Sequence, residues 1–162
     1  MTMTAKEVSL RRQSFGAVVL ICLQAGLGMF VNLFVSIPRH HSGSQASEFF
    51  SGSAKSVTWA ITHGAVALVL HAILGLLLAL MVIGMVATAL RIGRRSITTW
   101  IALGALFAIG AGFNGASFLV YNKDVSSFIM TMLALASLLC FLVVVYLPWG
   151  AAPPVPSDAT AS

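Results

Sequence analysis

The stretch VTWAITHGAVALVLHAILGLLLALMVIGMVATAL, residues 57–90, decides the fold. No Asp, Glu, Lys or Arg interrupts it. A membrane-spanning helix needs about 20 mostly apolar residues, so the stretch predicts a transmembrane helix. As one helix it would measure about 50 Å at 1.5 Å per residue. Because this exceeds one bilayer crossing, we expect the helix to tilt, to overhang the membrane or to break.

Three further uncharged apolar runs cover residues 15–37, 97–121 and 125–147. The whole chain is 59% hydrophobic and 8% charged, whereas a soluble domain carries about 25% charged residues. The connections are short enough for neighbouring helices to pack antiparallel. The sequence therefore predicts an all-α membrane four-helix bundle over residues 15–148. A cytoplasmic segment is expected at 1–14 and a disordered cytoplasmic tail at 149–162.

The basic residues predict the orientation of this bundle. Six of the nine Lys and Arg residues lie on the side of the N-terminus and of the connection RIGRRS. Since loops rich in Lys and Arg stay in the cytoplasm, both termini are expected there, in the plasma membrane of a bacterium. Aromatic residues that favour membrane interfaces agree with this topology. Trp59 and Tyr121 would mark the outer boundary, and Trp100, Tyr146 and Trp149 the inner one.

Small and polar residues recur at a spacing of four on three of the predicted helices. Residues four apart share one helical face, and in lipid such residues carry contacts between helices. The stripes are Gln24–Gly28–Asn32–Ser36, His63–Ala67–His71–Gly75–Ala79 and Gly104–Ala108–Gly112–Ala116. The glycines expected to allow close helix packing are Gly28, Gly75, Gly104, Gly112 and Gly115.

Several polar residues are expected at similar depth in the outer half of the bundle. They form a candidate polar cluster or ligand site: His63, His71, Asn32, Asn114 and Ser117, with Gln24 below them. Neutral His and Asn are cheaper to bury than charges. We therefore interpret these groups first as ties between helices, with His71 hydrogen-bonded to Asn32, Gln24 or Asn114.

The helix reading THGAVALVLHAILGLLLAL, residues 62–80, resembles the haem-bearing helices of four-helix b-type cytochromes and haem A synthase-like bundles. The resemblance implies haem b as an alternative cofactor, with His71 as an axial ligand. The sequence departs from the family pattern, because His63 and His71 are predicted on one helix and cannot both ligate one iron. The second ligand would then be Met29, Met130 or Met132, a loop histidine, or a residue of another subunit.

Other chemistry finds little support. His40 and His41 are interpreted as an exposed loop pair, because a zinc site needs more ligands at characteristic spacing. Cys22 and Cys140 match no redox motif. The predicted spans contain no carboxylate for a proton relay. No nucleophile–base pair, phosphate loop or basic face for nucleic acid is present. We accordingly expect no metal, no catalytic residue and no nucleic-acid partner.

The segments GLGMFVNLFVSIP and GAGFNGASF are similar to those of small four-span membrane proteins of bacteria, to which no activity is attached. Our first expectation is a non-enzymatic structural or accessory subunit of a membrane assembly, with no cofactor. Its partners would be the lipid bilayer and other membrane subunits or further copies of the chain. The alternatives are a haem-binding or haem-handling membrane protein and a small transporter subunit.

Overall fold

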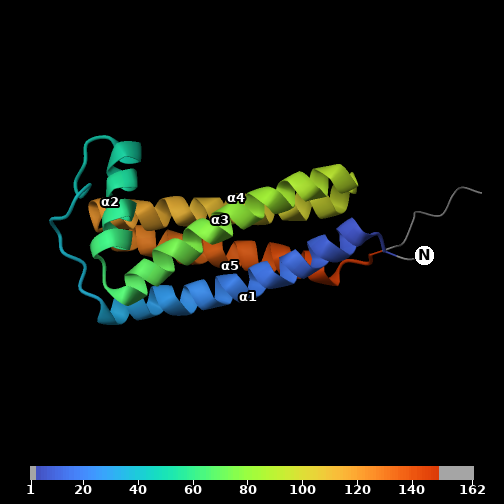
Figure 1. Cartoon of the computed structure of the whole chain (residues 1–162), viewed down its shortest axis with the longest axis horizontal. Helices are drawn as coiled ribbons and strands as arrows, with labels where there is room; N and C mark the ends of the chain where they lie inside the picture. Colours follow the sequence, from blue (N-terminus) through green and yellow to red (C-terminus); the bar gives the residue numbers. More distant parts are fainter. Residues whose placement is uncertain (1–2, 150–162) are drawn as a thin grey trace, which may run out of the picture.

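The computed structural model describes residues 3–149, which fold into five helices. Their bounds are α1 (Ala5–Phe34), α2 (Phe49–His63), α3 (Val66–Ile92), α4 (Arg95–Tyr121) and α5 (Asp124–Tyr146). The helices α1, α3, α4 and α5 are long and apolar enough to cross a membrane. They pack as one elongated bundle, with α2 at one end (Figure 1). The predicted all-α membrane four-helix bundle is confirmed.

The four spanning helices form a ring of antiparallel neighbours. Contacts join α1 to α3, α3 to α4, α4 to α5 and α5 to α1, while the helices of the diagonal pairs α1–α4 and α3–α5 lie farther apart. Short connections at 93–94 and 122–123 make α3, α4 and α5 consecutive antiparallel neighbours. Helix α1 is joined to α3 by residues 35–65, which include α2. The shorter α2 contacts only α3 and α4 and lies at a large angle to the bundle (Figure 1).

The predicted span over residues 57–90 is two helices. It breaks between His63 and Val66, so the first part belongs to α2 and the spanning helix is α3. Gly64 has an extended backbone (φ −72°, ψ 161°), and a Cβ at this position would collide with the carbonyl oxygen of Ala60. The break explains how a stretch too long for one crossing fits the membrane.

Residues 49–56, which lie between the predicted spans at 15–37 and 57–90, form the first half of α2, a helix that the sequence did not predict. Glu48 caps α2: its carboxylate accepts hydrogen bonds from the backbone N–H groups of Phe50 (3.0 Å) and Ser51 (2.6 Å). The buried face of α2 consists of Gly52, Ser56 and Ala60. These small side chains let the helix approach the preceding loop closely, which compensates for a composition that disfavours helix.

Two other helix ends differ from the prediction. Helix α1 begins at Ala5, inside the segment predicted as 1–14, because Thr4 and Glu7 form a reciprocal capping box. It ends at Phe34 rather than at 37, so Ser36 lies outside the helix. The tail predicted over 149–162 lies outside the described residues, apart from Trp149.

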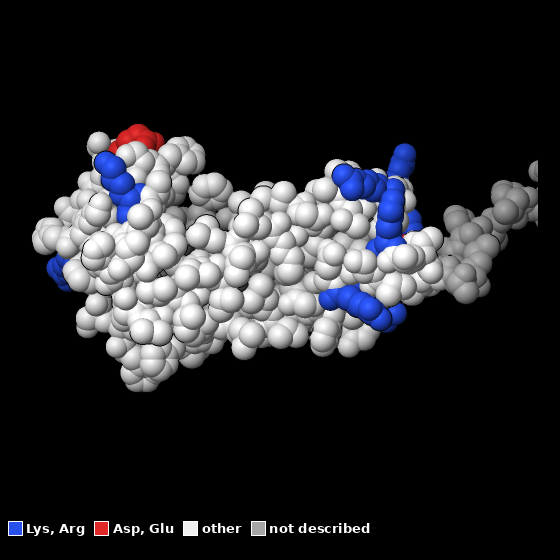
Figure 2. Space-filling view, viewed as in Figure 1, with Lys and Arg blue, Asp and Glu red and all other residues white. Residues whose placement is uncertain are grey.

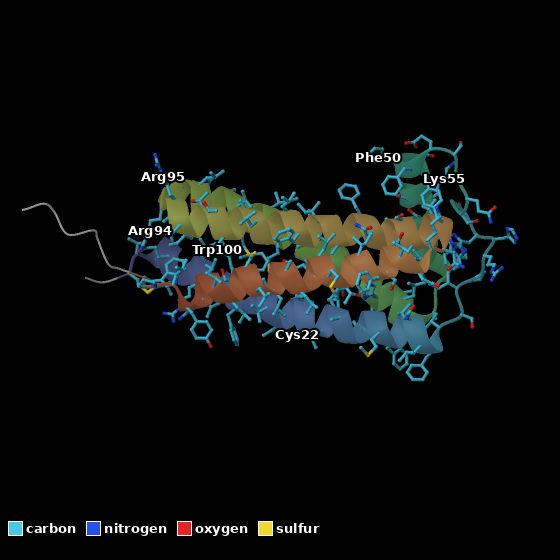
Figure 3. All side chains as sticks on the ribbon, turned by 180° about the vertical axis from the view of Figure 1, so that it is seen from behind. Cys22, Phe50, Lys55, Arg94, Arg95 and Trp100 are labelled. Carbon is cyan, nitrogen blue, oxygen red and sulfur yellow. The ribbon has the colours of Figure 1, made fainter. Side chains whose placement is uncertain are left out.

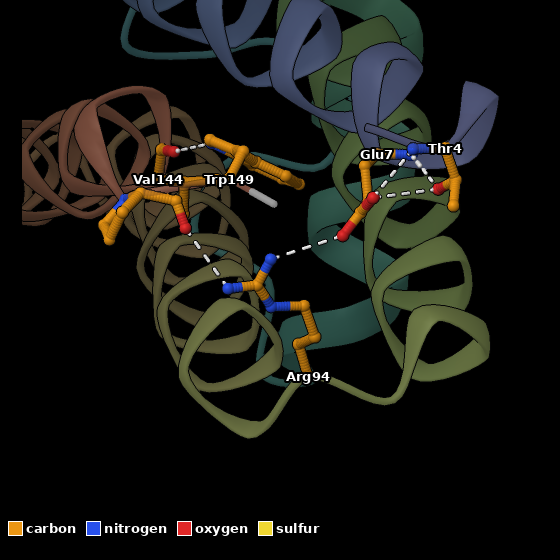
Figure 4. Close-up of polar contacts among 6 residues, drawn as sticks. Thr4, Glu7, Arg94, Val144 and Trp149 are labelled. Carbon is orange, nitrogen blue, oxygen red and sulfur yellow. Dashed lines mark hydrogen bonds and ion pairs between the residues drawn. The ribbon is translucent and has the colours of Figure 1, made fainter. Parts of the chain in front are cut away.

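Charged side chains gather at the two ends of the molecule and leave the middle bare (Figure 2). We call the end where α1 begins the Arg end and the opposite one the α2 end. At the Arg end, Arg94 joins three helices through an ion pair with Glu7 of α1 (3.3 Å) and a hydrogen bond to the carbonyl of Pro148 after α5 (3.2 Å; Figure 4). Arg11 also donates to the carbonyl of Val145.

The apolar core is continuous through all four spanning helices only in the half near the Arg end. Its buried members are Leu10, Ala17, Ile21, Leu78, Val82, Met85, Ala89, Ile97, Ile101, Ala105, Phe141 and Val144. A second, smaller cluster at the α2 end centres on Val31, Ala60 and Leu68. Towards that end the axes of α1 and α3 diverge from those of α4 and α5 (Figure 1), and α2 packs against both α3 and α4.

Candidate functional site

The clearest polar contact between spanning helices joins Gln24 of α1 to His71 of α3. The Gln24 side-chain amide donates a hydrogen bond of 2.7 Å to the backbone carbonyl of His71. A glycine stands opposite each of the two polar side chains. A Cβ at Gly28 would lie 3.0 Å from Cε1 of His71, and one at Gly75 would lie 2.9 Å from the Gln24 amide nitrogen. Two predicted stripes therefore meet here, and their glycines make room for the imidazole and the amide.

Two polar atoms of this contact have no partner. His71 Nδ1 and Gln24 Oε1 are buried, and neither makes a hydrogen bond within the described chain. An unsatisfied buried polar group costs about 1–3 kcal/mol. Of the expected partners of His71, Gln24 is the one that bonds it, but through the backbone carbonyl of His71 and not through its ring. The site is thus a helix tie with unused hydrogen-bonding capacity.

The other members of the predicted polar cluster are dispersed. Asn32 is exposed on α1. Asn114 donates to the carbonyl of Gly110 on its own helix (2.9 Å), and the hydroxyl of Ser117 lies 3.3 Å from that of Ser126. His63 ends α2, where it is exposed and its Nδ1 lies 2.7 Å from the Thr62 hydroxyl. The predicted cluster is therefore reduced to the Gln24–His71 contact.

The break after α2 also corrects the predicted relation between the two helical histidines. His63 and His71 lie on different helices, so the stripe through His63, Ala67 and His71 is interrupted. The sequence pattern misled here because the apolar run continues through the break without a proline or a charge.

The packing glycines on α4 divide into two kinds. A Cβ at Gly104 would lie 2.9 Å from the Phe141 ring, and one at Gly115 would lie 3.1 Å from Met130 Sδ, so both glycines allow close contact with α5. A Cβ at Gly112 would meet no other atom of residues 3–149 within 4 Å outside the local helix. The predicted seam through Gly112 is wrong, because α4 turns Ala111 inward at this level and Gly112 outward.

A second polar site, at the α2 end, was missed. His41, expected in an exposed loop, stacks on Trp59 with ring centroids 4.3 Å apart. Its Nε2 lies 3.1 Å from the carbonyl oxygen of Leu119 at the end of α4, and its Nδ1 lies 3.1 Å from that of Ser42. His41 also lines a pocket of about 320 Å³. These contacts depend on where the loop folds in space, so the spacing of residues in the sequence could not predict them.

Among residues 3–149, no three His, Cys, Asp or Glu side chains come together in a group able to hold a metal ion. Cys22 is exposed and Cys140 is buried, and both are free. Comparison with models of protein families, with curated proteins and with solved structures finds no match to this chain. The described polar sites present amide and imidazole groups that can form hydrogen bonds.

Proposed function

We propose that the chain is a non-enzymatic accessory subunit that associates sideways with other transmembrane helices in a bacterial plasma membrane. One exposed face of α1 carries the proposal. It consists of Cys22, Ala25, Gly26, Met29 and Asn32, which are all exposed and recur at spacings of three and four. Within residues 3–149, no atom outside the local helix lies within 4 Å of a Cβ built at Gly26.

The composition of this α1 face suits another helix better than lipid. Small residues let two helix backbones approach, and a polar side chain adds a hydrogen bond between the helices. Asn32 makes no side-chain hydrogen bond in the described chain and lies beside the exposed apolar side chains of Leu33 and Phe34. A partner helix with a polar group opposite Asn32 would satisfy its amide.

Photo-crosslinking in cells tests the proposal. A benzophenone amino acid at Met29 should form adducts with a second membrane protein. The same probe at Phe128, which is exposed near the same end of the bundle on α5, should form few. Asn32→Leu should lower the adduct yield at Met29. Differently tagged copies of the chain would show whether the partner is a second copy. Equal adduct formation at both positions, or none at Met29, would contradict the proposal.

We further propose that both termini lie in the cytoplasm, because the Arg end carries most of the positive charge. In a chain without its native cysteines, a cysteine at Ser44 should react with an impermeant thiol reagent on intact cells. A cysteine at Ser157 should react only after permeabilisation. The reverse pattern would invert the orientation.

Haem binding remains the second candidate because His71 Nδ1 is buried without a partner. The residues named as second ligands fit poorly: Met29 and Met132 are exposed, and Met130 lies against Gly115. When bound, haem would supply electron-transfer chemistry, and His71 would hold it from α3. A Soret band in protein purified with ample haem, lost in His71→Gln, would favour this candidate over the accessory subunit.

A further inference from the structure

Helix α2 has three distinct flanks, which follow from its 3.6-residue turn. One flank, Gly52, Ser56 and Ala60, is buried against the molecule. The next is apolar and consists of Phe50, Ala54, Val57 and Ile61. The third is polar and exposed and consists of Ser51, Lys55, Thr58 and Thr62. Apolar and polar flanks side by side on one helix are the pattern of a helix that lies in a membrane interface.

The apolar flank of α2 is unpartnered at its beginning. Phe50 is 69% exposed although it is a large apolar side chain. Figure 3 shows Phe50 at the end of α2 that projects beyond the bundle. Its ring lies beside the rings of Phe49 (centroids 5.5 Å apart) and Phe113 of α4 (6.4 Å).

The contact with Phe113 places the apolar flank at a depth in the membrane. Phe113 is itself 49% exposed on the surface of a spanning helix. It precedes Tyr121, the last residue of α4, by about 12 Å along the helix axis. A side chain that touches Phe113 from outside the bundle therefore lies at the level of lipid tails or of their boundary with the headgroups.

The surroundings of Phe50 are graded from apolar to charged. Phe49 continues the aromatic surface from Phe113 to Tyr121, with ring centroids 6.3 and 6.5 Å apart. Lys123 then lies over the Tyr121 ring, with Nζ 5.9 Å from the centroid. Aromatic rings followed by a cation are the usual order from lipid tails to headgroups. The Glu48 carboxylate occupies the first backbone N–H groups of α2, so these donors enter the interface already paired.

We propose that α2 is an interfacial helix whose apolar flank, led by Phe50, is inserted among the lipid acyl chains of the leaflet at the α2 end. Its polar flank faces water. Lipid covers the apolar flank of α2, because this flank continues the exposed surface of the spanning helix α4 at Phe113. Insertion of Phe50 holds the N-terminal end of α2 down on the membrane and fixes the loop that precedes it.

Spin-label accessibility in phosphatidylcholine nanodiscs tests the proposal on the full chain. Single cysteines replace Phe50, Ala54, Ser51 or Thr58 in a Cys22→Ala, Cys140→Ala background, and collisions with oxygen and with a water-soluble nickel complex are measured. Labels at 50 and 54 should favour oxygen, and labels at 51 and 58 should favour nickel. A label at 50 that favours nickel as the label at 51 does would overturn the proposal. Shielding of the label at 50 from both reagents would overturn it too, by showing a protein partner.

A second set of variants tests the anchoring by Phe50 through a label at Ala54. Phe50→Glu should abolish the oxygen preference of that label, because a carboxylate does not enter the acyl region. Phe50→Trp should keep it. The matched control is Ser51→Glu, which adds the same charge one residue along, on the polar flank, and should change nothing. An unchanged label in Phe50→Glu would contradict an anchoring role, and helical circular dichroism would show that the variant is folded.

Discussion

The half of the bundle near the Arg end and the half near the α2 end are held together by different means. In the first, large apolar side chains from all four spanning helices meet in one core around Phe141, Met85 and Ile101. In the second, the helices diverge into the pairs α1–α3 and α4–α5 (Figure 1). Each pair is joined by small residues and single hydrogen bonds, such as Gln24 to His71. The comparison shows that one chain combines a closed, tightly packed end with an end where polar groups and glycine faces remain available.

The largest effect should come from filling a glycine position in the common core. Gly104→Leu should lower the free energy of unfolding by about 1–3 kcal/mol or more, because the added side chain meets the Phe141 ring. Gly112→Leu on the same helix faces open space and serves as the control. Its cost should be small, since Leu is also the better helix former. Denaturation in detergent measures both costs, and equal costs would remove the distinction between the packed position at Gly104 and the outward one at Gly112.

A medium effect is expected from breaking the tie between α1 and α3. Gln24→Leu removes the hydrogen bond to the His71 carbonyl, and one bond between membrane helices contributes about 0.6–1.7 kcal/mol. Gln24→Glu should also lower the free energy of unfolding although it keeps the size of the side chain, because a carboxylate cannot donate this bond. The same denaturation assay gives both costs. No loss of stability in Gln24→Leu would mean that this hydrogen bond does not stabilise the contact between α1 and α3.

A smaller effect is expected at His71 itself. Its Nδ1 has no partner, so His71→Leu removes an unsatisfied buried atom while the backbone carbonyl still accepts from Gln24. Replacing such a group with an apolar one is close to neutral, and the change should stay within about 1 kcal/mol of the native chain. A cost of several kcal/mol in the denaturation assay would show that the imidazole has a bonded partner.

The smallest effect concerns the loop at the α2 end. The two ring nitrogens of His41 lie 3.1 Å from the carbonyl oxygens of Ser42 and Leu119, and the ring stacks on Trp59. These contacts join the loop to α2 and to the end of α4. Loss of the two polar contacts should therefore loosen the loop and leave the bundle unchanged.

Hydrogen exchange of residues 38–46 measures this effect. His41→Phe keeps an aromatic ring against Trp59 but removes both polar contacts of the imidazole, so protection of this segment should be lower than in the native chain. Residues of α4 near Ile101 serve as the control and should keep their protection. Unchanged protection of residues 38–46 in His41→Phe would show that the two polar contacts do not hold the loop.

The sequence predicted the spanning helices because their apolar runs are long and uninterrupted, a signal that depends only on local composition. It also placed Gln24, Gly28, His71 and Gly75 on contact faces, since helical periodicity determines which residues share a face. Helix α2 was missed because Ser and Gly favour loops, and only the Glu48 cap and packing by small residues overcome that preference. The His41 contacts depend on tertiary placement of a loop, which no periodicity encodes.

The predicted stripes failed because a spacing of four does not follow the packed face of a helix for long. Asn32 and Gly112 are exposed, whereas their neighbours Val31 and Ala111 are buried at the same level. In a helix of 3.6 residues per turn each step of four advances about 40° around the axis, so a stripe leaves the packed face after a few steps. The proposed function rests on the outward face of α1 that includes Gly26 and Asn32.

Distances between spin labels test the divergence most directly. One pair, on Phe15 of α1 and Ala102 of α4, spans the half near the Arg end, and a second pair, on Leu33 and Phe113, spans the half near the α2 end. All four positions are exposed. Electron–electron resonance on the full chain in nanodiscs should give a longer and broader distance for the second pair. Equal distances of equal width would contradict the account, because the four helices would then share one core along their whole length.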